Sequence, residues 1–168
     1  MTDPEITSGR ACAFTGHRRI PPQTLPELRA HLCRVLAELY AEGFSAFYTG
    51  GALGFDQLAA AEVLHLREQH PEVRLTVLCP CKDQDARWTA EQREAYRRQL
   101  EQADRVRVLA PVYYPGCMQA RNRALIDAAE VCVAYGRRQD SGTAQTVALA
   151  CAKGIPVIHL DEDPPKTE

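Results

Sequence analysis

Three short segments of the chain place glycine beside hydroxyl, basic or acidic side chains in loops that follow apolar runs. They are Thr15–Arg18 (TGHR), Gly50–Asp56 (GGALGFD) and Ser141–Thr143 (SGT). Glycine has no Cβ atom, so its backbone N–H groups can approach a ligand, and a helix that follows adds unpaired donors and a favourable dipole. A single turn of this kind also occurs simply to connect a strand to a helix. Three such turns favour a phosphate-binding site, with contacts predicted from Thr15, Gly16, Gly50, Gly51, Gly54, Gly142 and Thr143.

The two best-known phosphate-binding fingerprints are both missing. The chain contains neither the GxGxxG pattern of dinucleotide-binding folds nor the GxxxxGK[ST] pattern of P-loops. A standard hydride-transfer dehydrogenase and a P-loop NTPase are therefore disfavoured.

Two acidic residues in the helix predicted after the second glycine-rich turn have competing interpretations. Glu62 falls near the middle of the apolar arc formed by residues 55, 58, 59, 63 and 66, where a carboxylate is costly unless it is paired. It either forms an ion pair with a local arginine or points into the ligand cleft, where it would contact ribose hydroxyls and is the one candidate catalytic residue. Asp56 either caps its helix or contacts the ligand.

Other polar side chains raise the same question of structure against ligand binding. Asn122 lies on the apolar face of the helix predicted from residue 117 to residue 129, and Arg121 is next to it. Because a buried amide needs partners, the pair is predicted to hold a phosphate or base, with neighbouring loop backbone as the alternative. His17 in the first turn is predicted to bind phosphate or to act as an acid or base, with capping of the loop as the alternative, and Arg18 is predicted to supply charge to a phosphate. Trp88 is predicted either to stack on a base or to cover the helices as part of the apolar packing.

The cysteines are interpreted as structural thiols rather than as metal ligands or a disulfide framework. Cys79 and Cys81 form a C-x-C pair, and no second C-x-x-C or HExxH motif occurs among the seven cysteines and five histidines. No metal is predicted. No G-x-S-x-G segment supports a Ser/His/Asp triad.

The elements that must position these residues alternate between strands and helices. Strands are predicted at 11–15, 44–49, 74–78, 105–109, 131–135 and 156–159. Helices are predicted from the capping-box pair Thr24 and Glu27 to Gly43, and at 55–69, 90–103 (with Thr89 and Gln92 as a second capping box), 117–129 and 143–153. This alternation predicts an α/β fold, a single Rossmann-like domain with a mostly parallel sheet and helices on both faces. One domain is expected over residues 1–168, with its core at about 11–160 and loose ends, above all in DEDPPKTE (161–168).

The order of elements also predicts where a ligand binds. In parallel sheets ligands bind beyond the carboxyl ends of the strands, and the unusual residues do follow predicted strands, including the loop from Tyr135 to Thr143. The opposite connections, at 41–43 and 153–154, have the composition of plain helix exits.

Composition places the chain among ordinary globular proteins. It has 168 residues, 45% hydrophobic and 25% charged, and a net charge of −2. That charge provides no global basic field for nucleic acid. No apolar segment reaches the length of a membrane span, and MTDPEITSGR lacks the apolar core of a signal peptide. A cytoplasmic location, no membrane partner and reduced thiols are expected.

Five segments together resemble the SLOG superfamily, most closely its YpsA-like branch. They are FTGHR, GGALGFDQLAAAE, the PC-x-x-Q-x-x-x-W element, RNRALID and SGTAQT, in that order and spread over residues 11–160. The resemblance implies a Rossmann-like domain that binds a nucleotide-derived ligand, with NAD or ADP-ribose derivatives as the usual suggestion. Related phosphoribohydrolases carry PGGxGTxxE, whereas Gln145 and Thr146 stand here where the glutamate region falls. The relative DprA has a similar second loop and binds single-stranded DNA.

Three functions from different classes follow. The first and favoured one is a cytosolic binding domain for a nucleotide or nucleotide-derived ligand, with a sensor role as an extension. The second is a nucleotide N-glycosidase resembling the phosphoribohydrolases, in which Glu62 or Asp56 stabilises positive charge on the ribose. The third, a single-stranded nucleic acid binder, is disfavoured by the charge balance. Whether the protein is an enzyme stays open, no cofactor other than the nucleotide-derived ligand is predicted, and a homo-oligomer is allowed.

Overall fold

A six-stranded parallel sheet forms the centre of the molecule, which we describe from a computed structural model over residues 9–136 and 141–161. The predicted loose ends fall largely outside these residues, as do residues 137–140 of the loop after the fifth strand. The strands are β1 (Arg10–Gly16), β2 (Phe44–Thr49), β3 (Arg74–Cys79), β4 (Arg105–Val108), β5 (Val131–Tyr135) and β6 (Val157–His159). Their order across the sheet is β4-β3-β2-β1-β5-β6, and every neighbouring pair is parallel.

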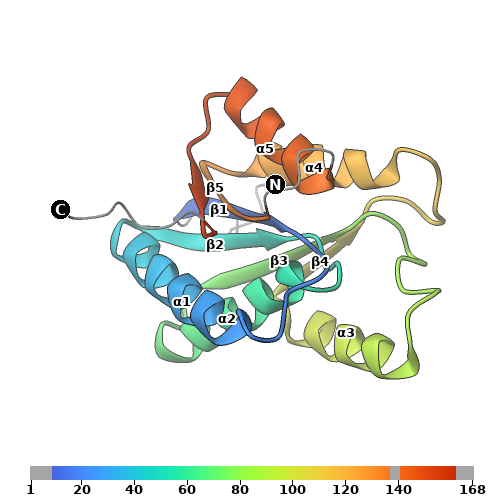
Figure 1. Cartoon of the computed structure of the whole chain (residues 1–168), viewed down its shortest axis with the longest axis horizontal. Coiled ribbons are helices and arrows are strands. Elements are labelled where there is room, and N and C mark those ends of the chain that lie inside the picture. The colour runs from blue at the N-terminus through green and yellow to red at the C-terminus, as the bar shows by residue number, and fades with distance from the viewer. Residues whose placement is uncertain (1–8, 137–140, 162–168) are drawn as a thin grey trace, which may run out of the picture.

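Helices cover both faces of the sheet, as the alternating sequence predicted. They are α1 (Leu25–Ala41), α2 (Phe55–Gln69), α3 (Ala90–Gln102), α4 (Cys117–Ala128) and α5 (Gly142–Ala152). Figure 1 shows α1, α2 and α3 on one side of the strands and α4 and α5 on the other. The α/β Rossmann-like fold expected from the sequence is therefore confirmed.

The strand order reverses between β1 and β5. The chain builds β1 to β4 in one direction, crosses back over the sheet through α4, and adds β5 on the free side of β1. A crevice opens at such a reversal because the connections after the two central strands run to opposite faces. The fold thus provides a site at the carboxyl ends of β1 and β5.

The main core lies between the sheet and the layer of α1 and α2. Phe14, Phe47 and Phe55 are fully buried there, and the ring centroids of Phe14 lie 6.0 Å from Phe47 and 6.3 Å from Phe55. The predicted apolar face of α1 is buried as a unit, from Leu28 to Leu39. This packing fixes the start of α2 beneath the end of β1.

The helix ends agree with the sequence in part. Thr89 and Gln92 form the predicted capping box at the start of α3, and Gly43 follows α1 with a φ of 99°. The capping box predicted from Thr24 and Glu27 is wrong, because the Thr24 side chain makes no capping hydrogen bond and instead donates to the carbonyl of Pro21 at 2.8 Å.

Candidate functional site

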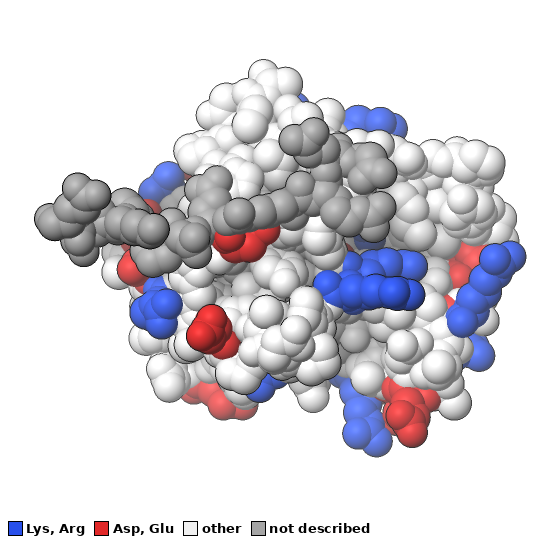
Figure 2. Space-filling view, viewed as in Figure 1, with Lys and Arg blue, Asp and Glu red and all other residues white. Residues whose placement is uncertain are grey.

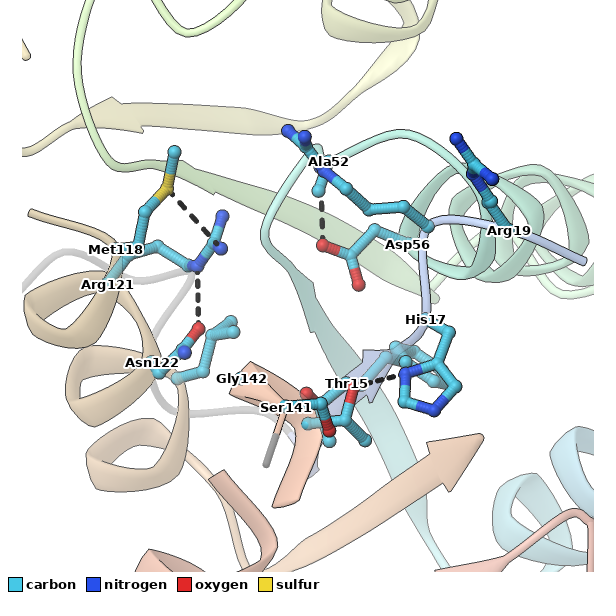
Figure 3. A pocket seen from close by; sticks show the side chains of 15 residues that line it. Thr15, His17, Arg19, Ala52, Asp56, Met118, Arg121, Asn122, Ser141 and Gly142 are labelled. Carbon is cyan, nitrogen blue, oxygen red and sulfur yellow. Dashed lines mark hydrogen bonds between the residues drawn. The ribbon is translucent and has the colours of Figure 1, made fainter. Parts of the chain in front are cut away.

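A cavity of about 810 Å³ opens at the carboxyl edge of the sheet, at the strand-order reversal. Its walls come from the end of β1 and the turn after it, the turn before α2, one face of α4 and the start of α5. Figure 3 shows these four segments around one open space. The predicted site residues that line the cavity are Thr15, Gly16, His17, Arg18, Asp56, Arg121, Asn122, Gly142 and Thr143.

Arg121 is a buried cation held rigidly in the cavity wall. Its Nη1 donates to the carbonyl of Gly50 at 2.8 Å and its Nε donates to Asn122 Oδ1 at 2.8 Å, while Met118 Sδ lies 3.9 Å from Nη2 (Figure 3). Only 7% of Arg121 is exposed. These contacts join α4 to the turn after β2 and give the buried amide of Asn122 its partner. Among the described residues, no carboxylate lies within ion-pairing distance of the Arg121 guanidinium.

Asp56 is the one acidic side chain among the described residues lining this cavity. It is 6% exposed, and its Oδ2 accepts a hydrogen bond from the Ala52 N–H at 3.2 Å. Burial raises the pKa of this carboxyl to about 6, although the Arg121 and Arg18 charges and the Ala52 N–H act in the opposite direction. The predicted helix cap is not observed, because residue 54 is the N-cap of α2 and no side chain caps the helix.

The first turn of α5 forms the opposite wall. Ser141 caps this helix by accepting from the Ala144 N–H at 3.1 Å, and the Thr143 hydroxyl lies 3.4 Å from His17 Nδ1. A Cβ atom at Gly142 would meet nothing nearer than Asn122, at 3.9 Å. Backbone donors at the start of this helix are therefore accessible to an anion in the cavity.

Two further arginines stand at the rim. Arg18 and Arg19 line the cavity and are exposed, and Figure 2 shows Lys and Arg side chains gathered near the middle of the face in view. Arg19, together with Ala52, Met118 and Ser141, was missed among the residues predicted from the sequence. The pairing of Arg19 with Arg18 directly after a glycine-containing turn was the available signal.

The glycines of the second turn have a structural reason other than access to a ligand. Gly50, Gly51 and Gly54 do not line the cavity. A Cβ atom at Gly54 would overlap the backbone carbonyl of Arg18, and one at Gly50 would overlap the Arg121 guanidinium. Gly51 and Gly54 also have φ values of 70° and 84°. Glycine here lets two loops and a helix pack in direct contact, and this packing shapes the cavity.

Glu62 is buried, as predicted, but does not face the cavity. Its Oε1 lies 3.5 Å from Arg29 Nε and its Oε2 lies 3.6 Å from His65 Nδ1, in a separate cavity of about 170 Å³ between α1 and α2. The predicted contact between Glu62 and a ligand in the glycine-lined cleft is therefore not supported by its position. The alternative interpretation, an ion pair with a local arginine, describes what the structure contains.

Trp88 also lies away from the cavity. Its ring packs edge-on against Tyr96, with 5.0 Å between centroids, and covers part of the main core. Its alternative role, as part of the apolar packing over the helices, matches this position.

The cysteines are free in the described residues. Cys79 Sγ lies 3.0 Å from the Tyr96 hydroxyl, and burial raises the pKa of Cys81 to about 12. No group of three or more His, Cys, Asp or Glu side chains in residues 9–136 and 141–161 is arranged to hold a metal ion. In the same residues, no helix combines the length and apolar character that a membrane span requires.

Solved structures with the same architecture include DNA processing protein A from two bacteria. The Helicobacter pylori protein, whose structure was described for its single-stranded DNA binding mode, superimposes with a TM-score of 0.67 at 21% identity, over 98% of this chain and 71% of that one. The Streptococcus pneumoniae protein gives 0.64 at 15% identity, over 92% and 51%. These similarities concern the fold.

Sequence relatives are more informative about family. The uncharacterised SPbeta prophage-derived protein YoqJ of Bacillus subtilis is 35% identical over 71% of this chain and 78% of its own length. A UPF0398 protein of Bacillus pumilus is 31% identical over 61% of this chain, and the match spans 56% of that relative. The family model YpsA, described as the YspA SLOG family, matches residues 22–153. The cavity described above is thus built on the framework of that family, and the chain belongs to the YspA SLOG family.

Proposed function

We propose that the cavity binds a nucleotide or nucleotide-derived ligand of the NAD or ADP-ribose type through its phosphates. The observation that carries this proposal is the buried Arg121 guanidinium, fixed by Gly50 and Asn122 in the cavity wall with no carboxylate partner among the described residues. A buried cation that makes no ion-pair contact is incompletely compensated, although the Asp56 carboxyl lines the same cavity, and this favours an anion beside it.

The surroundings of Arg121 fit the same ligand class. The first turn of α5 offers backbone donors, Arg18 and Arg19 add charge at the rim, and a volume of about 810 Å³ has the size of a small-molecule site. Phosphates are the ligand groups that best combine helix N-termini with arginine side chains.

Calorimetric titration with ADP-ribose, NAD and AMP tests the proposal, with a thermal-shift measurement in parallel. At a ligand concentration of 100 times Kd, binding stabilises the fold by about 2.7 kcal/mol, a readily measured rise in Tm. The double variant Arg18→Gln/Arg19→Gln is expected to weaken binding by about tenfold or more, because each exposed arginine supplies a charge-assisted contact. Arg34→Gln, an exposed change on α1 away from the cavity, is the matched control. Absence of binding by all three ligands contradicts the proposal.

The same titrations separate the other two functions. Chromatography of each ligand after long incubation tests for cleavage of the N-glycosidic bond, and recovery of intact ligand supports a binding domain or sensor. A labelled oligo(dT) strand that binds more tightly than every nucleotide, with a steep salt dependence, identifies a nucleic-acid binder instead.

A further inference from the structure

The position of Asp56 adds a second chemical requirement to the cavity. Its carboxylate points into the open space between Arg121 and His17 in Figure 3, while the Ala52 N–H occupies one side of Oδ2 at 3.2 Å. No cationic side chain in the described residues lies within 4.0 Å of it, so it enters no salt bridge there. A buried carboxylate can accept several hydrogen bonds. The backbone N–H groups of Ala52 and Gly50 use part of this capacity, and the rest is available to the contents of the cavity.

The charges around Asp56 restrict which part of a ligand can lie beside it. Arg121 faces it from α4, Arg18 faces it from the turn after β1, and His17 and Arg19 line the same cavity. A phosphate placed against the carboxylate would be repelled, whereas the arginines and the first turn of α5 attract it. The group next to Asp56 must instead donate hydrogen bonds. In a nucleotide, the donors nearest to the phosphate are the hydroxyls of the ribose.

We propose that Asp56 accepts hydrogen bonds from the ribose hydroxyls of the bound nucleotide and makes the cavity selective for ribonucleotide over deoxyribonucleotide ligands. This inference rests on the proposed function, because it assigns the second half of the same site. It gives Asp56 the role that the sequence suggested for Glu62.

The proposal fixes the direction of a pH effect. Hydroxyl donors stabilise the charged carboxylate, so bound ligand lowers the Asp56 pKa from about 6 and binding releases a fraction of a proton near that pH. Affinity therefore falls as pH drops through 6. Other charged groups line the same cavity, so the effect of Asp56 is isolated by comparing the wild type with an Asp56 variant.

The decisive experiment compares ADP with 2′-deoxy-ADP and 3′-deoxy-ADP by calorimetry, in the wild type, Asp56→Ala, Asp56→Asn and the control Glu68→Gln, an exposed change on the same helix. We expect the wild type and Glu68→Gln to lose about tenfold or more in affinity when the contacted hydroxyl is missing. In Asp56→Ala that loss shrinks to less than about threefold. Asp56→Asn removes the charge and keeps the shape of the side chain. Melting curves check that both Asp56 variants are folded.

The number of protons released or taken up on binding is measured by calorimetric titration with ADP-ribose in two buffers of different ionisation enthalpy. ADP-ribose is used because its phosphates do not change charge near pH 6. Greater proton release by the wild type than by Asp56→Asn supports the proposal. An equal proton count in the two proteins, or equal affinity for ADP and both deoxy forms in the wild type, overturns it while leaving phosphate binding intact. If the wild type binds neither ADP nor ADP-ribose, the proposed function itself fails.

Discussion

At the scale of single residues, two buried carboxylates on one helix have opposite relations to stability. Glu62 pairs with Arg29 and His65, whereas Asp56 enters no ion pair among the described residues and accepts hydrogen bonds from backbone N–H groups of Ala52 and Gly50. An unpaired buried charge costs folding free energy, so a chain selected for stability alone would not keep it. Asp56 is therefore where we expect stability and binding to oppose each other.

Asp56→Asn is predicted to stabilise the protein at neutral pH. With its pKa raised to about 6, the folded state holds a proton that the unfolded chain has already lost above pH 4. Stability contributed at low pH is therefore lost as pH rises from about 4 to 6, and the loss stays constant above. Asparagine does not titrate and avoids this loss, which is on the order of 3 kcal/mol for a pKa raised from 3.8 to about 6. Urea unfolding at pH 7 and pH 4 measures it, and an equal effect of the variant at both pH values contradicts the prediction.

Glu62→Gln is predicted to have the reverse profile. The change removes the charge that partners Arg29 and His65 from a side chain that is only 7% exposed, so the free energy of unfolding falls by about 1–2 kcal/mol. Affinity for ADP-ribose stays unchanged because the residue lies outside the large cavity. Melting curves and ADP-ribose titrations of Glu62→Gln test the expected loss of stability and the unchanged affinity, with Glu68→Gln as the control. Weaker binding with no loss of stability would instead indicate that Glu62 contacts the ligand.

At the scale of elements, direct packing between loops determines the shape of the cavity. The His17 N–H donates to the Tyr135 carbonyl at 3.0 Å, and the His17 carbonyl accepts from the Phe55 N–H at 3.1 Å. The backbone of one residue, His17, thereby joins the end of β5 to the start of α2 through the turn after β1. The close approach at Gly54 completes this junction.

Gly54→Ala and Gly116→Ala compare the junction with an open turn, because both glycines have positive φ, 84° and 98°, and both precede a helix. Gly116 has left-handed helical geometry (ψ −6°), where alanine costs about 1–2 kcal/mol, whereas Gly54 (ψ −122°) has a conformation that L residues rarely adopt, so backbone strain adds to the contact there. A Cβ atom at residue 116 meets nothing within 4 Å, whereas one at residue 54 overlaps the Arg18 carbonyl. We expect Gly54→Ala to lower Tm clearly more than Gly116→Ala. Equal melting temperatures would show that the Arg18 loop yields at no cost.

The elements themselves were largely predictable, and the reasons differ by residue. Helical spacing revealed the buried face of α1 because one face of this helix packs on the sheet and its opposite face is in contact with water. The same spacing showed that Glu62 is buried but could not show that α1, rather than the cleft, lies opposite it. Glycines after strands located the carboxyl edge correctly. Their reason was missed because sequence spacing does not reveal that Arg18 and Arg121 approach them from distant parts of the chain.

At the scale of the whole molecule, the return crossover through α4 creates the site. It brings Arg121, Asn122 and the start of α5 to the turns after β1 and β2, far from them in sequence. Alternation of strands and helices predicts a parallel sheet but leaves the strand order open, so the convergence of these loops was expected only from the general rule for such sheets. The same order leaves β4 as an edge strand.

The β4 edge is predicted to limit solubility. The exposed large hydrophobic side chains of the described residues all fall in one stretch: Val106, Val108, Val112, Tyr113 and Tyr114. β4 alternates arginine with exposed valine, and exposed apolar side chains beside the unpaired backbone groups of an edge strand promote association of partly unfolded chains. Val108→Lys is expected to raise the temperature at which light scattering begins, whereas Gln119→Lys adds the same charge on α4 and leaves it unchanged. If light scattering begins at the same temperature in both variants, aggregation starts from a segment other than β4.

The tight loop junction also constrains how this protein can change over evolutionary time. Alanine at residue 16 would overlap Phe55, alanine at residue 50 would overlap Arg121, and alanine at residue 136 would overlap His17. A glycine at this junction is therefore replaced at least cost after, or together with, a change in its partner side chain, and single replacements pass through a destabilised intermediate. Among descendants of this sequence, substitutions should arrive at these positions in pairs, and the wall of the cavity should diversify more slowly than the helices around it.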